Sequence, residues 1–331
     1  MFARSRLVVP ALVAVLLATA CGDTFRPPAA VVEGSKITDG DLQRGIPLFQ
    51  FLASIREQQC GSGQAQHGES PLAACSRFVL TQLITEQIVA SYAHEHDVTV
   101  TQGETENALA SLEQQLGSHD AVEEHLSEFH LAFSDLRNLA QRLLLVQKVA
   151  RAVADHEVSN GELVKRYRQE QVQFTTLHVA HILVRHRAIA ARIAAEATPR
   201  NFARLARRYS TDSASASQGG DLGEVVASQL DPTIAQAALS LSPGAISGPV
   251  HTQFGWHVIR LISERVTPFP QVRDQILDQF AGSAFTSWLK RQLRSGTVHV
   301  NPRYGRLDAG TEQALPVTCT AATPSPSCAA T

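Results

Sequence analysis

The chain has few aromatic residues, a single methionine and no long block of charge of one sign. Aromatic residues make up 6% of the sequence, and the formal net charge is −2. Proteins that bind nucleic acid carry a basic stripe or patch, so this charge balance argues against a nucleic-acid partner. Plentiful alanine with few aromatic residues favours helix.

No apolar run after the first twenty residues approaches the roughly 20 residues of a membrane-spanning helix. The first residues instead follow the pattern of an export signal. Arg4 and Arg6 precede the apolar stretch Leu7–Leu17, which Pro10 interrupts. We therefore expect a protein that is exported and is not held by a transmembrane helix.

The end of this signal resembles a bacterial lipobox. Ala18-Thr19-Ala20-Cys21 places a cysteine after small residues, although Leu17 stands one position earlier than is usual. The resemblance implies that residues 1–20 are a lipoprotein signal peptide and that Cys21 becomes lipidated. The lipid on Cys21 would then be the only membrane attachment, on the extracytoplasmic side. An ordinary secretory signal with an incidental Cys21 stays open.

The remaining cysteines form no Cys-x-x-Cys pair, which argues against a zinc ribbon or a thioredoxin-like site. Four cysteines in an exported chain suggest disulfides, and sequence alone allows three pairings. We favour the local pairings, Cys60 with Cys75 and Cys319 with Cys328.

Two stretches, residues 39–171 and 268–294, carry the spacing of amphipathic helices. In the first, Leu80, Leu83 and Ile84 recur at three- and four-residue intervals. Thr101-x-x-Glu104 and Ser159-x-x-Glu162 are capping-box patterns. A short strand and turn are expected at 30–38, a linker at 21–29, and a disordered Ala/Thr/Pro/Ser-rich tail at 307–331.

Residues 172–265 have a mixed pattern. Leu177, Val179, His181 and Leu183 alternate with His178, Ala180, Ile182 and Val184, as in a strand that is buried on both faces. A helix is expected over 188–208, with an interruption at Pro199 and a restart at Asn201. Gly219-Gly220 marks a loop, 232–241 a short helix, and 246–250 with 256–263 a strand pair.

Several motifs occur in one order in this region. They are His178-Val179-Ala180-His181-Ile182-Leu183-Val184, Tyr209-Ser210-Thr211-Asp212, Gly219-Gly220-Asp221-Leu222-Gly223 and Phe254-Gly255-Trp256-His257. Together they resemble a parvulin-type peptidyl-prolyl cis/trans isomerase domain. The flanking helical segments resemble the chaperone portions of SurA-like and PrsA-like foldases. The resemblance implies an α+β fold, in which a mainly helical chaperone lobe contains an inserted FKBP-like parvulin domain with an antiparallel sheet.

The resemblance also implies which residues form the site. His181 and His257 would face each other across the sheet, with Asp212 beside them as the acidic group. Leu230, Ile234 and Phe254 would form the apolar cup for the proline ring. Ile234 departs from the family pattern, which has an aromatic residue there. Asp221 is expected to fix its glycine loop, and no cofactor or metal is implied.

The same residues could in principle serve other functions. His178, His181, His251 and His257 could bind a metal, but His178 and His181 lie on opposite faces of a strand. Ser210, Asp212 and His181 could form a hydrolase triad, but no Gly-x-Ser-x-Gly turn surrounds Ser210. The serious alternative is a catalytically weak holdase that binds unfolded clients, which the Ile234 departure keeps open.

The sequence therefore predicts an extracytoplasmic, lipid-anchored foldase that isomerises X–Pro bonds of newly exported, unfolded proteins. The domains expected are a helical chaperone domain at 30–171, a parvulin domain at 172–265 and a C-terminal helix at 266–306 that completes the chaperone lobe.

Overall fold

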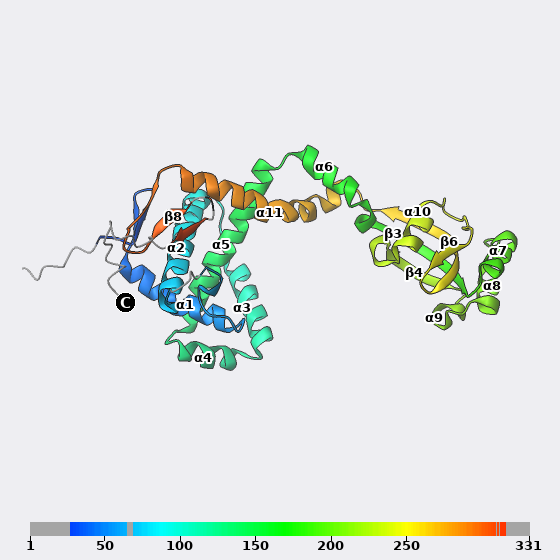
Figure 1. Ribbon diagram of the computed structural model, residues 1–331, viewed down its shortest axis with the longest axis horizontal. Coiled ribbons are helices and arrows are strands. Elements are labelled where there is room, and N and C mark those ends of the chain that lie inside the picture. The colour runs from blue at the N-terminus through cyan, green and yellow to red at the C-terminus, as the bar shows by residue number, and fades with distance from the viewer. Residues whose placement is uncertain (1–26, 65–68, 309, 311, 316–331) are drawn as a thin grey trace, which may run out of the picture. The chain divides into compact units, whose positions relative to one another are not determined.

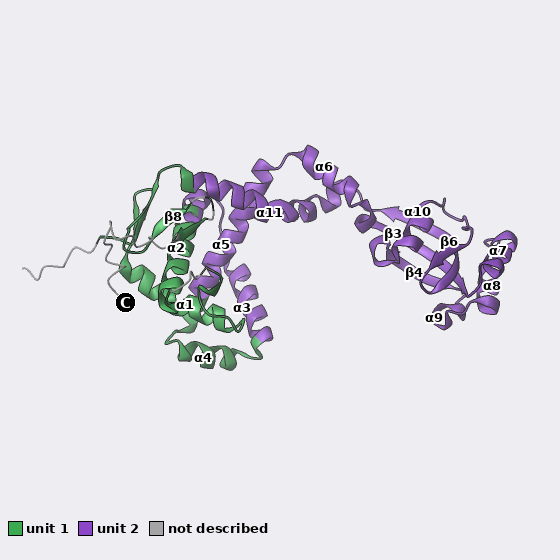
Figure 2. Ribbon diagram, in the orientation of Figure 1, with its two compact units in different colours: residues 1–88, 116–136, 293–331 green, residues 89–115, 137–292 purple. Residues whose placement is uncertain are grey.

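A computed structural model of the full chain describes residues 27–64, 69–308, 310 and 312–315 (Figure 1). The lipidation candidate Cys21 and the pair Cys319 and Cys328 lie outside these residues. The chain folds into two compact units (Figure 2). The first unit comprises residues 1–88, 116–136 and 293–331, and the second comprises 89–115 and 137–292. This division does not separate residues 172–265 from the rest of the second unit, so the predicted limits of that domain stay a prediction.

Helices dominate before residue 172, as the apolar spacing predicts. The helices are α1 (Asp39–Ser54), α2 (Pro71–Glu95), α3 (Gln102–Leu116), α4 (His119–Glu128), α5 (Phe133–Glu157) and α6 (Asn160–Gln169), with a 3-10 turn η1 (Ser62–Gln64). Both predicted capping boxes form. Thr101 and Glu104 exchange side-chain and backbone hydrogen bonds, and so do Ser159 and Glu162. Such reciprocal bonds satisfy amide groups that a helix start otherwise leaves unpaired.

A small antiparallel sheet joins segments from distant parts of the sequence. Strand β1 (Ala30–Val32) pairs with β2 (Ser35–Ile37) on one side and with β7 (Val298–Val300) on the other. Strand β7 follows the long helix α11 (Phe269–Arg294). The chain thus returns after residue 266 to pair with its own beginning, the connectivity that an inserted domain requires.

The predicted disordered tail does not begin at residue 307. Strand β8 (Arg306–Asp308) pairs with β9 (Gln313–Leu315), and Ala314 is fully buried. The Ala314 amide donates to Thr81 Oγ1, and the Ala314 carbonyl accepts from Arg77. The prediction was wrong here because backbone hydrogen bonds to α2, which composition does not reveal, hold this segment.

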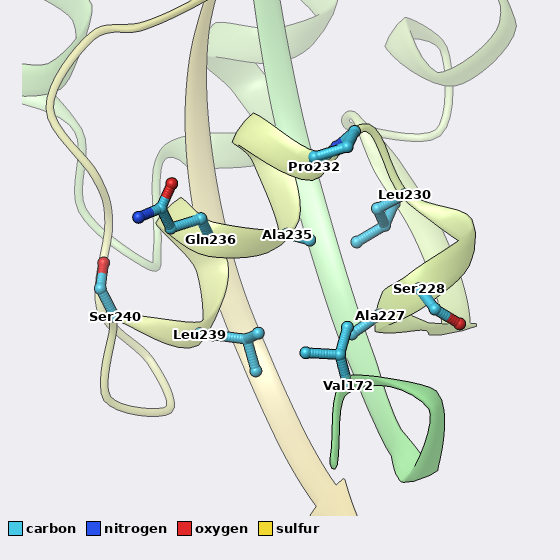
Figure 3. Close-up of a pocket in the computed structure, with 9 residues that line it drawn as sticks. All are labelled: Val172, Ala227, Ser228, Leu230, Pro232, Ala235, Gln236, Leu239 and Ser240. Atoms are coloured by element: carbon cyan, nitrogen blue, oxygen red, sulfur yellow. The ribbon is translucent and has the colours of Figure 1, made fainter. Parts of the chain in front are cut away.

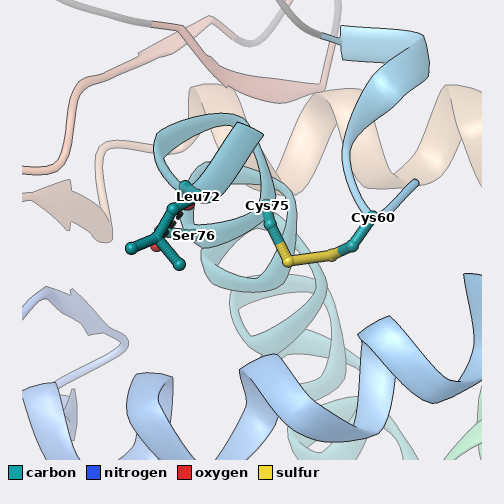
Figure 4. The surroundings of a disulfide bond; sticks show 4 residues. All are labelled: Cys60, Leu72, Cys75 and Ser76. Carbon is teal, nitrogen blue, oxygen red and sulfur yellow. Dashed lines mark hydrogen bonds between the residues drawn. A yellow bond between two sulfur atoms is a disulfide. The ribbon is translucent and has the colours of Figure 1, made fainter. Parts of the chain in front are cut away.

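A disulfide joins Cys60 to Cys75, with a Cα–Cα distance of 4.9 Å (Figure 4). It links the segment after α1 to the first turns of α2. Gly61 lies beside it with φ +76°, and a Cβ there would be 2.6 Å from the Ala74 backbone. The bond and the tight packing at Gly61 hold this segment against the start of α2, in agreement with the local pairing predicted from sequence.

The mixed region after α6 forms a four-stranded antiparallel sheet of order β4-β3-β6-β5. Its strands are β3 (Thr175–Val184), β4 (Asp221–Val226), β5 (Val250–Thr252) and β6 (Gly255–Val266). The helices around it are α7 (Arg187–Glu196), α8 (Phe202–Tyr209), α9 (Ser213–Ala216) and α10 (Pro232–Leu239), with 3-10 turns η2 (Gln171–Phe174) and η3 (Ala227–Gln229).

The predicted strand at 246–250 forms in part. Ile246 makes an isolated bridge to Arg260, flanked by backbone hydrogen bonds from Leu261 to Ala245 and from Ser247 to Ile259, and the regular pairing of β5 with β6 begins at Val250. Asn201 does stand at the helix start, but its side chain makes no cap to α8; it accepts a hydrogen bond from the Thr198 amide instead.

Both faces of the central strand β3 are covered, as its apolar pattern predicts. One face packs Ala180, Ile182 and Val184 against residues of α7 and α8. The other packs Leu177 and Val179, together with Ile259 and Leu261 of β6, against residues of α10. His181 continues this second face by alternation along β3, because residues two apart share a face.

Candidate active site

His181 and His257 are buried side by side on the sheet. In the register of β3 and β6, His257 lies opposite Leu183, two residues from His181. Diagonal neighbours of this kind share one face and lie within reach of each other. The Nδ1 atoms of the two rings are 3.2 Å apart, and the side chains are almost inaccessible to solvent. The facing pair expected from the sequence is therefore present in the structure.

Asp212 reaches His181 from the turn between α8 and α9. Its Oδ2 atom lies 2.8 Å from His181 Nε2, and the same oxygen accepts from the Ser215 hydroxyl. The Ala214 amide donates to Oδ1. These hydrogen bonds, that from Ser215 foremost, lower the pKa of Asp212 to about 2. Asp212 is therefore ionised at neutral pH.

The backbone that positions Asp212 is fixed by the edge of β3. Beyond Ala180, strand β4 no longer pairs with β3. Leu183 instead accepts a bond from the Thr211 amide and donates one to the Ser210 hydroxyl. The side chain and backbone of the Tyr209-Ser210-Thr211-Asp212 motif thus replace a neighbouring strand.

Gly220 completes this edge, because its carbonyl accepts from the His181 amide at 2.8 Å. A Cβ at Gly220 would lie 2.1 Å from the His181 carbonyl oxygen, and its φ is +79°. Only glycine fits such an approach. Asp221 holds the loop as predicted, accepting from the Gly223 amide and lying 2.8 Å from His178 Nε2.

Burial fixes the charge state of His257. Desolvation, followed by repulsion from the neighbouring His181 ring, lowers the pKa of His257 to about 4 from its ordinary 6.5. The His257 ring is therefore neutral at pH 7. Thr252 Oγ1 lies 2.8 Å from His257 Nε2 and also accepts from the Phe254 amide.

These contacts define one direction of hydrogen bonding when the His181 ring is uncharged. Ionised Asp212 can only accept, so His181 Nε2 carries the proton and His181 Nδ1 accepts from His257 Nδ1. Neutral His257 then has Nε2 free to accept from the Thr252 hydroxyl. Every ring nitrogen has a partner, so the network holds two imidazoles and one carboxylate in fixed orientations.

The three predicted apolar residues lie in different environments. Leu230 and Ile234 belong to one apolar cluster beneath α10, where Ile234 is 7% exposed. Phe254 lies in the turn between β5 and β6 and is 66% exposed, outside that cluster. The structure therefore brings Leu230 and Ile234 together but leaves the Phe254 side chain in solvent.

An apolar groove of about 500 Å³ opens beside Leu230 (Figure 3). Its wall is formed by α10, η3 and η2, through Val172, Ala227, Ser228, Leu230, Pro232, Ala235, Gln236, Leu239 and Ser240. None of His181, Asp212 and His257 lines it. Asp231 lies between the groove and the imidazole pair. It follows Leu230 in sequence, and its negative charge favours the protonated form of His257. Sequence reasoning missed this groove, although Pro232, Ala235, Gln236 and Leu239 recur at helical spacing.

The described residues contain no group of three His, Cys, Asp or Glu side chains arranged to hold a metal ion. His178 lies apart from the His181 pair and contacts Asp221. Among the described helices, none has the length and hydrophobicity of a transmembrane span.

Comparisons with known proteins agree with this architecture. A family profile described as rotamase, PPIC-type PPIase domain, matches residues 181–263. These limits enclose both imidazoles and Asp212. The fold and the match define the class: the chain contains a parvulin-type peptidyl-prolyl cis/trans isomerase domain.

Curated relatives extend the similarity beyond that domain. The foldase protein PrsA of Clostridium acetobutylicum is 32% identical over 290 residues, which cover 82% of this chain and 86% of the relative. The foldase protein PrsA of Caldanaerobacter subterraneus is 30% identical, over 75% of this chain and 77% of the relative. The crystal structure of PrsA from Bacillus subtilis is 23% identical, covers 82% of this chain and 94% of that chain, and has a TM-score of 0.30. The chain belongs to the PrsA foldase family.

Proposed function

We propose that His181, Asp212 and His257 form the site at which this foldase twists X–Pro bonds of unfolded, newly exported proteins. The observation that carries the proposal is the continuous hydrogen-bond network from Asp212 through both buried imidazoles to Thr252. Rotation about an X–Pro bond has a barrier near 18–20 kcal/mol and takes tens to hundreds of seconds unaided.

The reaction breaks no covalent bond, so the site has only to favour the twisted amide over the planar one. The imidazoles hold the Asp212 carboxylate and the Thr252 hydroxyl in fixed orientations around the prolyl bond. Fixed dipoles in a dry environment cost little reorganisation as the amide loses resonance. Reducing the barrier by about 1.4 kcal/mol already gives a tenfold rate.

Leu230 supplies the apolar contact for the proline ring, and Ile234 lies behind it as the floor of the cup. The groove beside Leu230 would receive the apolar client segment that flanks the prolyl bond. Phe254, exposed in the turn next to Thr252, would close over the ring when a client binds. These three roles complete the substrate site that the sequence predicts.

The protein would act outside the cytoplasm, anchored through a lipid on Cys21. The signal pattern of residues 1–20 and the lipobox-like Ala18-Thr19-Ala20-Cys21 support this location. Replacement Cys21→Ser should abolish incorporation of a labelled fatty acid and release the protein from the membrane fraction. Labelling that survives this replacement would contradict the anchor.

A second function, a holdase of low catalytic activity, rests on Ile234. Its side chain is aliphatic and 7% exposed, so the cup lacks the flat aromatic surface of the family pattern. In this alternative the helical region, residues 30–171 and 266–306, binds unfolded clients, and the parvulin domain contributes contacts only.

The full mature chain, carrying Cys21→Ser for solubility, separates the two functions. We expect it to accelerate cis-to-trans conversion of a proline-containing peptide, measured by NMR exchange, and to lose most of that rate on Asp212→Ala. A chain that suppresses aggregation of an unfolded client but does not accelerate the peptide would support the holdase and overturn the catalytic proposal. Thermal unfolding of each variant controls for loss of fold.

A further inference from the structure

The segment between His181 and Asp212 carries an unusual concentration of positive charge. Within residues 185–208, Glu196 is the only acidic residue, whereas seven arginines are present, all of them exposed: Arg185, Arg187, Arg192, Arg200, Arg204, Arg207 and Arg208. The whole chain has a formal net charge of −2. The positive charge is therefore local, and the balanced composition of the chain conceals it.

None of these seven arginines forms an ion pair with a carboxylate of the residues that the structure describes. Four of them contact ring faces or backbone instead. The guanidinium groups of Arg192 and Arg208 lie 5.9 and 5.3 Å from the centre of the Tyr209 ring. Arg207 Nε donates to the Ser217 carbonyl. These contacts orient the side chains without neutralising their charge.

Four of the arginines form one surface, which we name the arginine face: Arg192, Arg204, Arg207 and Arg208. On α8, Arg204, Arg207 and Arg208 have the three- and four-residue spacing of a single helix face. The other face of α8 is buried through Phe202, Leu205 and Ala206. Arg192 of α7 joins them because it shares the Tyr209 ring with Arg208. Like charges so placed repel one another, and an anion would relieve that repulsion.

The site itself argues against an acidic client residue as the anion. Asp212 is ionised beside the imidazoles, and Asp231, whose pKa is lowered chiefly by a hydrogen bond from the Thr233 backbone amide, acts on His257. Both carboxylates would repel an acidic side chain next to the prolyl bond. The arginine face, by contrast, lies on the exposed surface of two helices, α7 and α8, and is therefore open to an extended anionic partner.

We propose that the arginine face docks on an anionic phospholipid surface. Lipid phosphates form a laterally extended array of negative charge, and each arginine or lysine near it contributes about 1 kcal/mol. Guanidinium groups are weakly hydrated and bind phosphate oxygens in pairs. The proposal rests on the proposed lipid anchor, since a tether at Cys21 raises the local concentration of the face at the membrane.

Flotation with lipid vesicles tests the proposal on the full mature chain carrying Cys21→Ser, so that no lipid anchor contributes. We expect binding to vesicles of equal parts phosphatidylglycerol and phosphatidylcholine, no binding to phosphatidylcholine alone, and loss of binding at high salt. The variant Arg192→Gln/Arg204→Gln/Arg208→Gln should bind at least tenfold more weakly.

A matched control removes the same charge elsewhere. Arg56, Lys165 and Arg168 are also exposed and form no ion pair within the described chain. The variant Arg56→Gln/Lys165→Gln/Arg168→Gln should retain vesicle binding within about twofold, because its arginine face is intact. Equal weakening by the two triple variants would show an effect of net charge only and would overturn the proposal.

Peptide turnover measured without vesicles separates this proposal from the proposed function. The arginine-face variant should isomerise Ala–Pro and Glu–Pro peptides at the wild-type rates. Selective loss of Glu–Pro turnover with unchanged vesicle binding would mean that the face recognises acidic clients, and the membrane proposal would fail. Inactivity of every chain on peptides, with anion-dependent vesicle binding, would refute the catalytic proposal and leave the docking surface.

Discussion

The arginines of the helical region and those on α7 and α8 of the parvulin domain differ in their partners. In the helical region, arginines link elements that are distant in sequence: Arg151 pairs with Asp274 and Asp278, and Arg273 pairs with Asp155. In the parvulin domain, the arginines of α7 and α8 have no carboxylate partner among the described residues. Ion pairs thus link helices in the helical region, whereas the positive charges on α7 and α8 remain available to a partner.

Buried polar groups have different roles in the two regions. The sheet of the parvulin domain encloses two imidazoles, which apolar residues of similar size could replace with less desolvation cost. In the helical region, buried Arg77 and Thr81 instead hold a chain segment in place through hydrogen bonds to the Ala314 backbone, alongside apolar packing and a disulfide. A buried polar network that packing does not require is expected where a site needs fixed dipoles.

Removal of the disulfide should have the largest effect on the helical region. The bond between Cys60 and Cys75 spans a sequence separation of 15 residues, and closing a loop of that length stabilises a fold by about 3 kcal/mol. Cys60→Ser/Cys75→Ser should lower the urea midpoint of the helical region, followed by circular dichroism. Peptide turnover by the parvulin domain should stay unchanged. The variant Cys319→Ser/Cys328→Ser is the control, and an unchanged midpoint in the first variant would contradict the prediction.

Acid should destabilise the parvulin domain through His257. The folded pKa of about 4 lies below the ordinary 6.5, so between these values the unfolded chain binds more protons than the folded one. Stability contributed by neutral His257 is therefore present above pH 6.5 and is lost as pH falls toward 4. At pH 5 the loss is roughly 2 kcal/mol. The variant His257→Gln should show that much less acid destabilisation, and the NMR titration of His257 should have its midpoint near 4. A midpoint near 6.5 would refute its desolvation.

Neutralising Asp212 should reduce catalysis without unfolding the domain. Asp212→Asn keeps the size of the side chain but removes the charge that fixes the His181 Nε2 proton. We expect at least a tenfold loss in turnover of a proline peptide, or about 1.4 kcal/mol, with an unfolding midpoint close to wild type. Asp221→Asn is the matched control at a carboxylate that holds a loop outside the network; it should keep most of the rate. Equal loss in both would indicate a structural role for Asp212.

The smallest expected effect is a difference in the free energy of unfolding between variants of paired and unpaired arginines. Arg151→Gln breaks two exposed ion pairs and should lower the free energy of unfolding by about 0.5 kcal/mol. Arg204→Gln removes a charge without a carboxylate partner and should leave stability unchanged or slightly raised. Calorimetry of both variants at low salt measures the difference. Equal destabilisation would mean that Arg204 has a stabilising partner.

Much of the fold could be predicted from local patterns. The alternation around His181 identified a strand buried on both faces, and the capping boxes at Thr101 and Ser159 formed as expected. These features depend on neighbours in sequence. The strand β9 was not predicted, because hydrogen bonds to Arg77 and Thr81 hold it in place, and these residues are more than two hundred positions away in sequence.

The candidate site was also predicted only in part. Motif order correctly indicated that His181, Asp212 and His257 would meet. The partners Ser215 and Thr252 were missed, since nothing in a single serine or threonine marks it as a hydrogen-bond partner to a distant side chain. The arginine face was missed for another reason. Its arginines are interspersed with apolar and alanine residues, so no block of like charge appears until α7 and α8 fold.

The most direct test of the catalytic site is prolyl isomerisation by the full mature chain, compared between wild type and His257→Ala. We predict that wild type accelerates cis-to-trans conversion of a proline peptide and that His257→Ala loses at least tenfold of that acceleration while keeping its ability to suppress aggregation of an unfolded client. A His257→Ala variant that folds and isomerises the peptide at the wild-type rate would contradict this role of the buried imidazoles.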